Sequence, residues 1–470
     1  PLLVVSVLIN FKIGEWLLNS TTNRTRSVLL GVGIGANLMC LSWFKYSYFF
    51  VANLTSISDV SLALPNIILP LGISFFTFQQ IAYLIDCHRE EAEKTNFLNY
   101  CLFVTFFPQL IAGPIVHHKE MLPQFSGKAK CLFKTSDLAV GVTIFAIGLF
   151  KKVVIADGIA EFSTPVFDQA GIGHEITFFS AWGAALSYTF QLYFDFSAYS
   201  DMAVGIGRMF GVRLPINFFS PYKSTSIIEF WRCWHMTLSR FLRDYLYFPL
   251  GGNRLGVTRR YINLMTVMII GGLWHGAGWT FVIWGALHGI YLVINHVWAA
   301  ILCQFGIESI RKLIGYRFFA WFITFLSVVI SWVLFRAETL DAAVEIFIGM
   351  AGFNGSALPP SFGNALIGVF GVSGVNISID PKIGDMNFLL QFLWIAAAGT
   401  IAFWFPNTYE WISDDTIILK SRIGKNKPSP IVWPVWKLNM VGSAILAILV
   451  YASLRNLLSD SPSEFLYFQF

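Results

Sequence analysis

Long apolar blocks separated by short polar connectors constrain this chain more than any other feature. Such blocks occupy residues 28–50, 67–85, 138–155, 394–405 and 431–454. A helix needs roughly 20 apolar residues to cross the hydrocarbon core of a bilayer, so the shorter blocks need tilt or shielding by protein. Because 56% of the residues are hydrophobic and only 13% are charged, the composition excludes an ordinary water-soluble fold. We therefore predict an all-α polytopic membrane protein.

The pattern indicates one membrane domain over residues 1–470. No Gly/Ser linker, low-complexity tract or repeat of about 20 to 50 residues interrupts it. Pro1 lies inside an apolar run, so we expect part of the first helix to precede it. The six cysteines are scattered without a C-x-x-C pair, which predicts neither a disulfide framework nor a metal site.

Positive charge is concentrated in one part of the chain. The whole chain has a formal net charge of +5, whereas residues 208–260 alone carry nine basic and two acidic residues, a net charge of +7. The positive-inside rule places this segment at the cytoplasmic face, where it could also attract a phosphate-bearing ligand. A topology signal without any ligand explains the charge equally well.

Two apolar segments are broken by glycine and proline, namely FPQLIAGP at residues 107–114 and GGLWHG at residues 271–276. Lipid cannot satisfy the backbone N–H and C=O groups that such breaks free. We therefore expect these segments to be re-entrant or to line a cavity enclosed by protein. An ordinary kinked helix is the alternative.

Residues 226–247 have the pattern of an amphipathic helix. Its apolar stripe consists of Ile227, Trp231, Trp234, Leu238, Phe241, Leu242 and Tyr245. Arg232, Arg240 and Arg243 fall off this stripe, which favours an interfacial helix in the cytoplasmic leaflet boundary. His235 falls on the apolar side, where it would be costly without a partner or a role.

The eight histidines are not equivalent. Polar connectors hold His88 and His174, and His117 and His118 follow a Gly-Pro break, so we expect none of these four to be catalytic. His288 and His296 lie on the apolar segment after the second break, and each is adequately explained as a hydrogen-bonded core histidine.

His275 differs because it lies between glycines in the tryptophan-rich segment GGLWHGAGW, residues 271–279. An ionisable residue within the membrane is a functional candidate by default. Burial disfavours the charged imidazolium, so we expect a neutral ring that can accept a proton as a general base. A structural histidine that bridges helices is the alternative.

Four segments together carry a resemblance to a known family. They are QLYFDFSAYSD (residues 191–201), EFWRCWH (residues 229–235), DYLYFPLGGNR (residues 244–254) and the segment around His275. With these the chain resembles the membrane-bound O-acyltransferases, and more narrowly the bacterial alginate O-acetylation branch. The similarity covers most of the chain, down to EFLYFQF at residues 464–470.

The resemblance implies a bundle of roughly ten or more transmembrane helices, with re-entrant and interfacial helices around a central catalytic funnel. The invariant histidine of the family matches His275, and an upstream polar residue matches His235. The implied activity moves an acetyl group from a cytoplasmic thioester donor, acetyl-CoA, across the inner membrane to an exopolysaccharide such as alginate or cellulose. Periplasmic acetyltransferase proteins, a polysaccharide synthase complex and membrane lipids are the implied partners; we expect neither a permanently bound cofactor nor nucleic acid.

We hypothesise that His275 removes the proton of an acceptor hydroxyl, while His235 orients the acyl group or stabilises the oxyanion. Arg232, Arg240 and Arg243 would attract the donor's phosphates, although anchoring to lipid headgroups explains them as well. Asp195 and Asp201 lie in an apolar region, and we expect them to pair with buried basic groups.

Other functions remain open from the sequence. Within the family, the alternatives are D-alanyl transfer to teichoic acid and acyl transfer to a protein or lipid. From another class, a transporter or flippase would also use broken helices, but no matching pair of broken helices occurs in the two halves of the chain.

Overall fold

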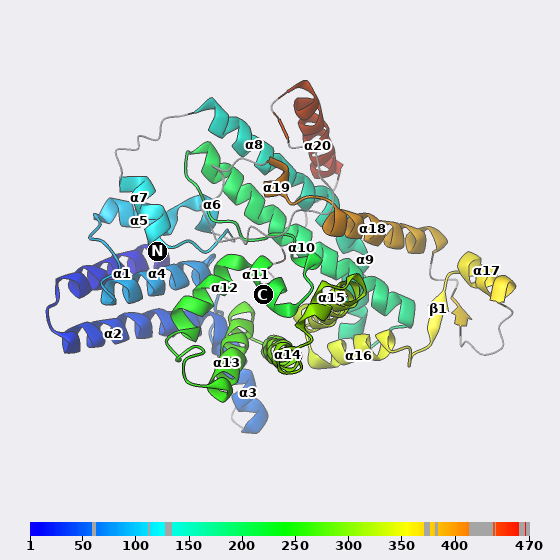
Figure 1. Cartoon of the computed structure of the whole chain (residues 1–470), viewed down its shortest axis with the longest axis horizontal. Coiled ribbons are helices and arrows are strands. Elements are labelled where there is room, and N and C mark those ends of the chain that lie inside the picture. The colour runs from blue at the N-terminus through cyan, green and yellow to red at the C-terminus, as the bar shows by residue number, and fades with distance from the viewer. Residues whose placement is uncertain are drawn as a thin grey trace.

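The computed structural model describes residues 1–58, 63–110, 113–126, 134–370, 377–380, 384–412, 436–437, 439–459 and 466, and most of these residues are helical (Figure 1). The first third contains α1 (Leu2–Asn19), α2 (Asn23–Leu41), α3 (Ser47–Ile57), α4 (Ile73–His88), α5 (Phe97–Thr105), α6 (Phe107–Leu110) and α7 (His118–Ser126). The middle contains α8 (Thr135–Phe150), α9 (Asp157–Gly171), α10 (Phe178–Met209), α11 (Ile227–Cys233), α12 (Met236–Leu242), α13 (Val257–His275) and α14 (Trp279–Gln304).

The last third contains α15 (Ile314–Arg336), α16 (Leu340–Met350), α17 (Pro360–Phe370), α18 (Asp385–Trp404), α19 (Thr408–Ile412) and α20 (Met440–Ser459). Two short strands, β1 (Ser356–Leu358) and β2 (Ile377–Ile379), pair in parallel. Three π-helical turns, η1 (Ser42–Tyr46), η2 (Lys151–Ala156) and η4 (Arg243–Tyr247), and two 3₁₀ turns, η3 (Pro221–Lys223) and η5 (Glu308–Lys312), complete the described elements.

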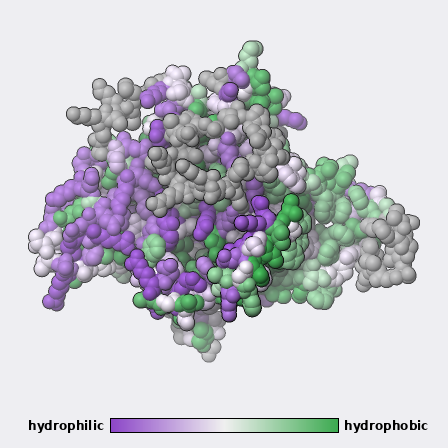
Figure 2. Space-filling view, in the orientation of Figure 1, coloured by the Kyte–Doolittle hydropathy of each residue, from purple (hydrophilic) through white to green (hydrophobic). Residues whose placement is uncertain are grey.

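Seven described helical segments are long and apolar enough to cross a membrane: Leu2–Asn19, Asn23–Ile57, Thr135–Gly171, Trp279–Gln304, Ile314–Arg336, Asp385–Trp404 and Met440–Leu458. Figure 2 shows hydrophobic residues over α15, α18 and α20. Exposed apolar side chains such as Phe318 (66% exposed) need lipid around them. The prediction of an all-α polytopic membrane protein is confirmed. Residues 431–435 and 438 of one expected apolar block, and all of residues 464–470 except Leu466, lie outside the described residues.

The longest helix, α10, crosses the centre of the molecule beside α8 (Figure 1). The two helices approach closely because glycines face each other; a Cβ on Gly141 would lie 2.7 Å from the carbonyl oxygen of Gly205. Two buried ion pairs hold α10 to η2. Lys151 Nζ lies 2.9 Å from Asp201 Oδ2, and Lys152 Nζ lies 2.8 Å from Asp195 Oδ1. The expected pairing of both aspartates with buried basic groups is confirmed.

Helices α13 and α14 form a tightly packed hairpin, and the position of its break corrects the sequence prediction. Gly271 and Gly272 are helical, and the chain leaves the helix only after His275, through an extended Gly276 with φ −156°. Gly272 is needed for packing, because a Cβ there would lie 2.3 Å from the carbonyl oxygen of Phe281 in α14. His275 therefore terminates a regular helix.

The segment of residues 226–247 is not one continuous amphipathic helix, which is a second correction. It divides at His235 into α11 and α12, and continues as η4. The expected apolar stripe is still buried, with Ile227, Trp234 and Leu238 at most 6% exposed, and these residues belong to the main core. The stripe therefore packs against protein.

The first glycine- and proline-containing segment is helical over residues 107–110 and irregular from residue 113. After the short helix α6, residues 114–117 follow without regular structure, and Ile115 and Val116 are each 1% exposed. Ile115 N donates to Thr237 Oγ1 at 3.0 Å. Protein thus shields this backbone and satisfies part of it, as expected for irregular structure in a membrane. Ile111 and Ala112 lie outside the described residues.

Candidate active site

His275 lies at the end of α13 inside an aromatic cage. The side chain is buried, and its ring packs edge-on against Trp274, Trp284 and Phe335, at centroid distances of 5.0, 5.3 and 5.2 Å. Aromatic walls of this kind exclude water from a reacting group. The expectation that His275 is buried is confirmed.

The backbone that carries His275 is anchored from another helix. Lys45 Nζ lies 2.6 Å from the carbonyl oxygen of Trp274 and 2.9 Å from that of His275, and Tyr46 Oη donates to the carbonyl oxygen of Leu273 at 2.8 Å. The last carbonyls of a helix have no partner within it, and a cation is favourable beside them. Lys45 was missed in the sequence analysis, although a lysine inside the apolar block of residues 28–50 is the appropriate signal.

His235 occupies the junction between α11 and α12. Its backbone has φ 40° and ψ 54°, a left-handed conformation that costs a non-glycine residue about 1–3 kcal/mol. The side chain is completely buried, and its Nδ1 lies 3.1 Å from Asn217 Oδ1. Asn217 Oδ1 also accepts from Thr237 Oγ1 at 2.8 Å and from Thr237 N at 3.3 Å. Such strain persists only where the surroundings impose it.

These contacts determine the tautomer of His235. The amide nitrogen of Thr237 can only donate, so the Asn217 atom that it faces is the oxygen, and His235 Nδ1 must donate its proton to that oxygen. In a neutral ring Nε2 then presents a lone pair. Among the residues that the structure describes, none forms a hydrogen bond with His235 Nε2. His235 thus presents a buried acceptor.

The structure brings His235 and His275 together although they are 40 residues apart in the sequence. Their ring centroids are 6.3 Å apart with an interplanar angle of 60°. Trp274 contacts both rings, at 6.2 Å from His235 and 5.0 Å from His275. Two imidazoles at this separation can act on one substrate group placed between them.

His288 lies close to this pair but uses both ring nitrogens. Trp231 Nε1 donates to its Nδ1 at 3.2 Å, and its Nε2 lies 3.0 Å from Ser331 Oγ. It is completely buried, as a hydrogen-bonded core histidine is expected to be. His117 lies elsewhere, with its Nδ1 3.2 Å from Tyr245 Oη.

The three arginines that were predicted to attract the donor do not form one free cluster. Arg240 binds both carboxylate oxygens of Glu120, with its Nη2 2.9 Å from Oε2, and Arg243 binds both oxygens of the neighbouring Asp244. Arg232 is exposed. Within the described ranges, no three His, Cys, Asp or Glu side chains are grouped so that they could hold a metal ion.

Comparisons with known proteins agree with this architecture. Residues 16–335 match the model of the membrane-bound O-acyltransferase family. The chain is 46% identical over 383 residues to a peptidoglycan O-acetyltransferase of Helicobacter pylori. The aligned region covers 76% of this chain and 71% of that protein. It is 38% identical over 466 residues to a probable alginate O-acetylase, AlgI, of Pseudomonas putida. Here the aligned region covers 96% of this chain and 85% of that protein.

A more distant relative bears on the acyl group. The chain is 30% identical over 243 residues to a teichoic acid D-alanyltransferase of Streptococcus thermophilus. The aligned region covers 48% of this chain and 57% of that protein. These relatives all transfer acyl groups, and none is named as a transporter or flippase. The chain belongs to the membrane-bound O-acyltransferase family and is a multi-pass membrane O-acyltransferase.

Proposed function

We propose that this protein moves an acetyl group from a cytoplasmic thioester donor, acetyl-CoA, across the bacterial inner membrane for the O-acetylation of a polysaccharide outside. The buried pair of His235 and His275 carries the proposal, because it places two proton acceptors in an enclosed aromatic site. The two relatives with the higher identities are named for O-acetylation, which supports acetyl over D-alanyl as the acyl group.

In the proposed reaction His275 acts as the general base. It removes the proton from an acceptor hydroxyl while that oxygen attacks the thioester carbonyl; a C–O bond forms, the C–S bond breaks, and the departing thiolate takes up a proton. His235 Nε2 is an acceptor in the neutral ring, so it cannot donate to an oxyanion, and it fits instead the orientation of an N–H or O–H of the bound substrates other than the reacting hydroxyl, whose one proton goes to His275. The aromatic cage limits hydrolysis of the thioester by water.

Two acceptor polymers are supported by specific relatives. The protein named as a peptidoglycan O-acetyltransferase has the higher identity, 46%, whereas the alginate O-acetylase matches nearly the whole chain. Both acceptors are polysaccharides, and an exopolysaccharide of the alginate or cellulose type remains our first proposal. Periplasmic acetyltransferase proteins and a polysaccharide synthase complex would be the partners at the outer surface.

Deletion of the gene tests the acceptor. We expect the ester-bound acetate of the exopolysaccharide to disappear in the deletion strain and to return with the wild-type gene. Loss of acetate from peptidoglycan alone would show that peptidoglycan, and not an exopolysaccharide, is the acceptor. Loss from neither polymer would contradict the proposal.

A reconstituted system tests the donor and the acyl group. Purified protein in liposomes is supplied with radiolabelled acetyl-CoA, or with a D-alanyl thioester, on the side of the basic segment. We expect transfer of acetyl but not of D-alanyl to a small hydroxyl acceptor. Transfer of D-alanyl alone would show that the acyl group is wrong, and no transfer of acetyl from coenzyme A would exclude this donor.

A further inference from the structure

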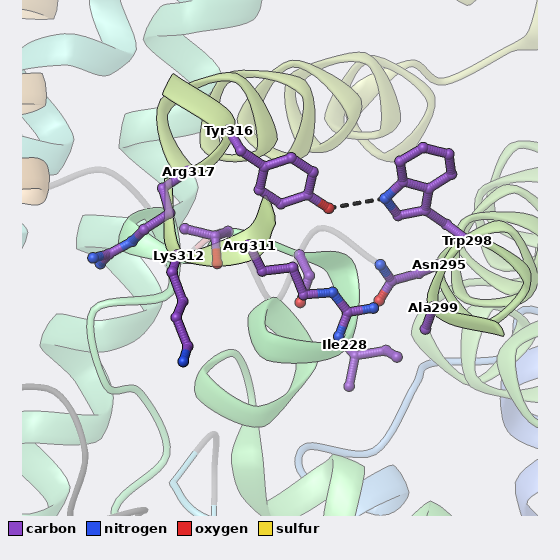
Figure 3. Close-up of a pocket in the computed structure, with 10 residues that line it drawn as sticks. Ile228, Asn295, Trp298, Ala299, Arg311, Lys312, Tyr316 and Arg317 are labelled. Carbon is purple, nitrogen blue, oxygen red and sulfur yellow. Dashed lines mark hydrogen bonds between the residues drawn. The ribbon is translucent and has the colours of Figure 1, made fainter. Parts of the chain in front are cut away.

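A surface cavity of about 570 Å³ lies between α11, α14, η5 and α15 (Figure 3). Neither His235 nor His275 lines it. Three basic side chains do, Arg311, Lys312 and Arg317, and no acidic side chain is among the lining residues. The cavity is therefore a separate feature of the molecule with a strongly positive wall.

The positive charges of the cavity have no carboxylate partner in the part of the chain that the structure describes. Among the described residues, no carboxylate forms an ion pair with Arg311, Lys312 or Arg317. The nearby carboxylate of Glu229 instead accepts hydrogen bonds from Thr225. A wall with three cations and no acidic lining residue favours an anionic ligand.

The cavity also contains polar groups that can donate to an anion. Figure 3 shows Arg311 reaching between Asn295 and Ile228, below a pair formed by Trp298 and Tyr316. Trp298 Nε1 donates to Tyr316 Oη at 2.8 Å, which leaves the proton of the Tyr316 hydroxyl available for another acceptor. Phosphate oxygens match such a set of cationic and neutral donors.

The two helices that border the cavity, α14 and α15, also carry exposed apolar side chains that do not line it. Ile294 of α14 is 58% exposed, and Ile314 and Phe318 of α15 are 87% and 66% exposed. Both helices are long and apolar enough to span a membrane, and the cavity lies where α14 ends and α15 begins. Tryptophan and tyrosine gather at this level of a membrane, and basic residues mark its cytoplasmic surface.

We propose that this cavity binds the phosphate headgroup of an anionic phospholipid of the cytoplasmic leaflet, whose acyl chains lie along α14 and α15. A water-soluble phosphate ligand would account for the basic wall but not for the exposed apolar surfaces beside it. Ser226 and Ile228 of the cavity wall are at the start of the segment that leads to His235. A lipid bound in the cavity thus contacts the start of the segment that carries His235.

Retention of lipid by the whole protein tests the proposal. The protein is reconstituted in nanodiscs of phosphatidylcholine and phosphatidylglycerol, extracted into detergent, and analysed by native mass spectrometry for bound phosphatidylglycerol. The cavity variant combines Arg311→Gln, Lys312→Gln and Arg317→Gln. Because the loss of three positive charges weakens the attraction for an anionic headgroup, we expect at least about tenfold lower retention than in the wild type.

A matched control removes the same charge outside the cavity. Arg24→Gln, Arg254→Gln and Arg259→Gln change three exposed basic residues that do not line it, and we expect wild-type retention. Equal retention by the cavity and control variants would overturn the proposal. Displacement of phosphatidylglycerol from the wild type by coenzyme A would also overturn it, because the cavity would then belong to the acyl donor.

A second variant covers the case in which the triple variant does not fold. Ile228→Trp fills the cavity and keeps all three charges, and we expect it to lose the bound phosphatidylglycerol while its elution from a sizing column stays unchanged. Undiminished retention by folded Ile228→Trp would contradict binding inside the cavity.

Discussion

Replacing Asn217 with leucine is expected to disable His235 without removing it. Asn217 Oδ1 accepts the protons of His235 Nδ1, Thr237 N and Thr237 Oγ1, and Asn217 is completely buried. Leucine has the same branched arrangement of non-hydrogen atoms but no acceptor. Two N–H donors then lose their partner, and each buried unsatisfied donor costs about 1–3 kcal/mol, so we expect the free energy of unfolding to fall by about 2–6 kcal/mol.

The catalytic effect of Asn217→Leu comes from the loss of the hydrogen bond to His235. That bond contributes about 0.5–1.5 kcal/mol to holding the ring and its tautomer, and about 1.4 kcal/mol corresponds to a factor of ten. We therefore expect kcat of the folded Asn217→Leu protein to fall by up to about tenfold, with KM for the donor unchanged. Steady-state acetyl transfer in liposomes measures kcat and KM, and chemical denaturation in detergent measures stability.

Asn37→Leu provides the matched control. Asn37 is a buried asparagine that exchanges hydrogen bonds with Asn10, away from the histidine pair. The Asn37→Leu variant should be less stable than the wild type but keep the kcat of the wild type. If folded Asn217→Leu kept the full kcat while losing stability to a similar extent, the positioning of His235 by Asn217 would be refuted.

Three further variants test the surrounding structure. Lys45→Met removes two charge-assisted hydrogen bonds of about 1.5–3 kcal/mol each from the end of α13, so kcat should fall at least tenfold with little change in KM; unchanged kcat would contradict the anchoring role. Gly272→Ala places a Cβ 2.3 Å from a carbonyl oxygen, and overpacking of about 1–3 kcal/mol should lower stability and activity together, whereas Gly31→Ala, with nothing within 4 Å, should change neither. Asp201→Asn should lower the free energy of unfolding by about 3–5 kcal/mol, because Lys151 keeps a buried charge without its partner, while activity per folded molecule stays the same.

The parts of the fold that follow from local sequence were predictable. The length of the apolar blocks predicted a polytopic membrane protein. The apolar residues around His275 predicted that its imidazole ring is buried. The buried aspartates on α10 were expected to find basic partners because an uncompensated charge in an apolar region is costly. None of these inferences requires knowledge of distant contacts.

The remaining features depend on contacts between distant segments. A 3.6-residue periodicity predicts a continuous helix through residues 226–247, but Asn217 fixes His235 in a left-handed conformation and divides the helix. Arg240 was interpreted as a donor-binding residue because its partner Glu120 is 120 residues away in the sequence. Lys45 likewise acquires its role only through α13, which lies more than 200 residues later.

The most direct test of the account is the rate of acetyl transfer by His275→Ala. The variant and an exposed-histidine control, His174→Ala, are reconstituted at equal amounts of folded protein, and a single turnover of labelled acetyl-CoA is followed. General base catalysis contributes about 10²–10⁴-fold, so we predict a loss of this size for His275→Ala and none for the control. Transfer by folded His275→Ala at the rate of the control would contradict the assignment of His275 as the base.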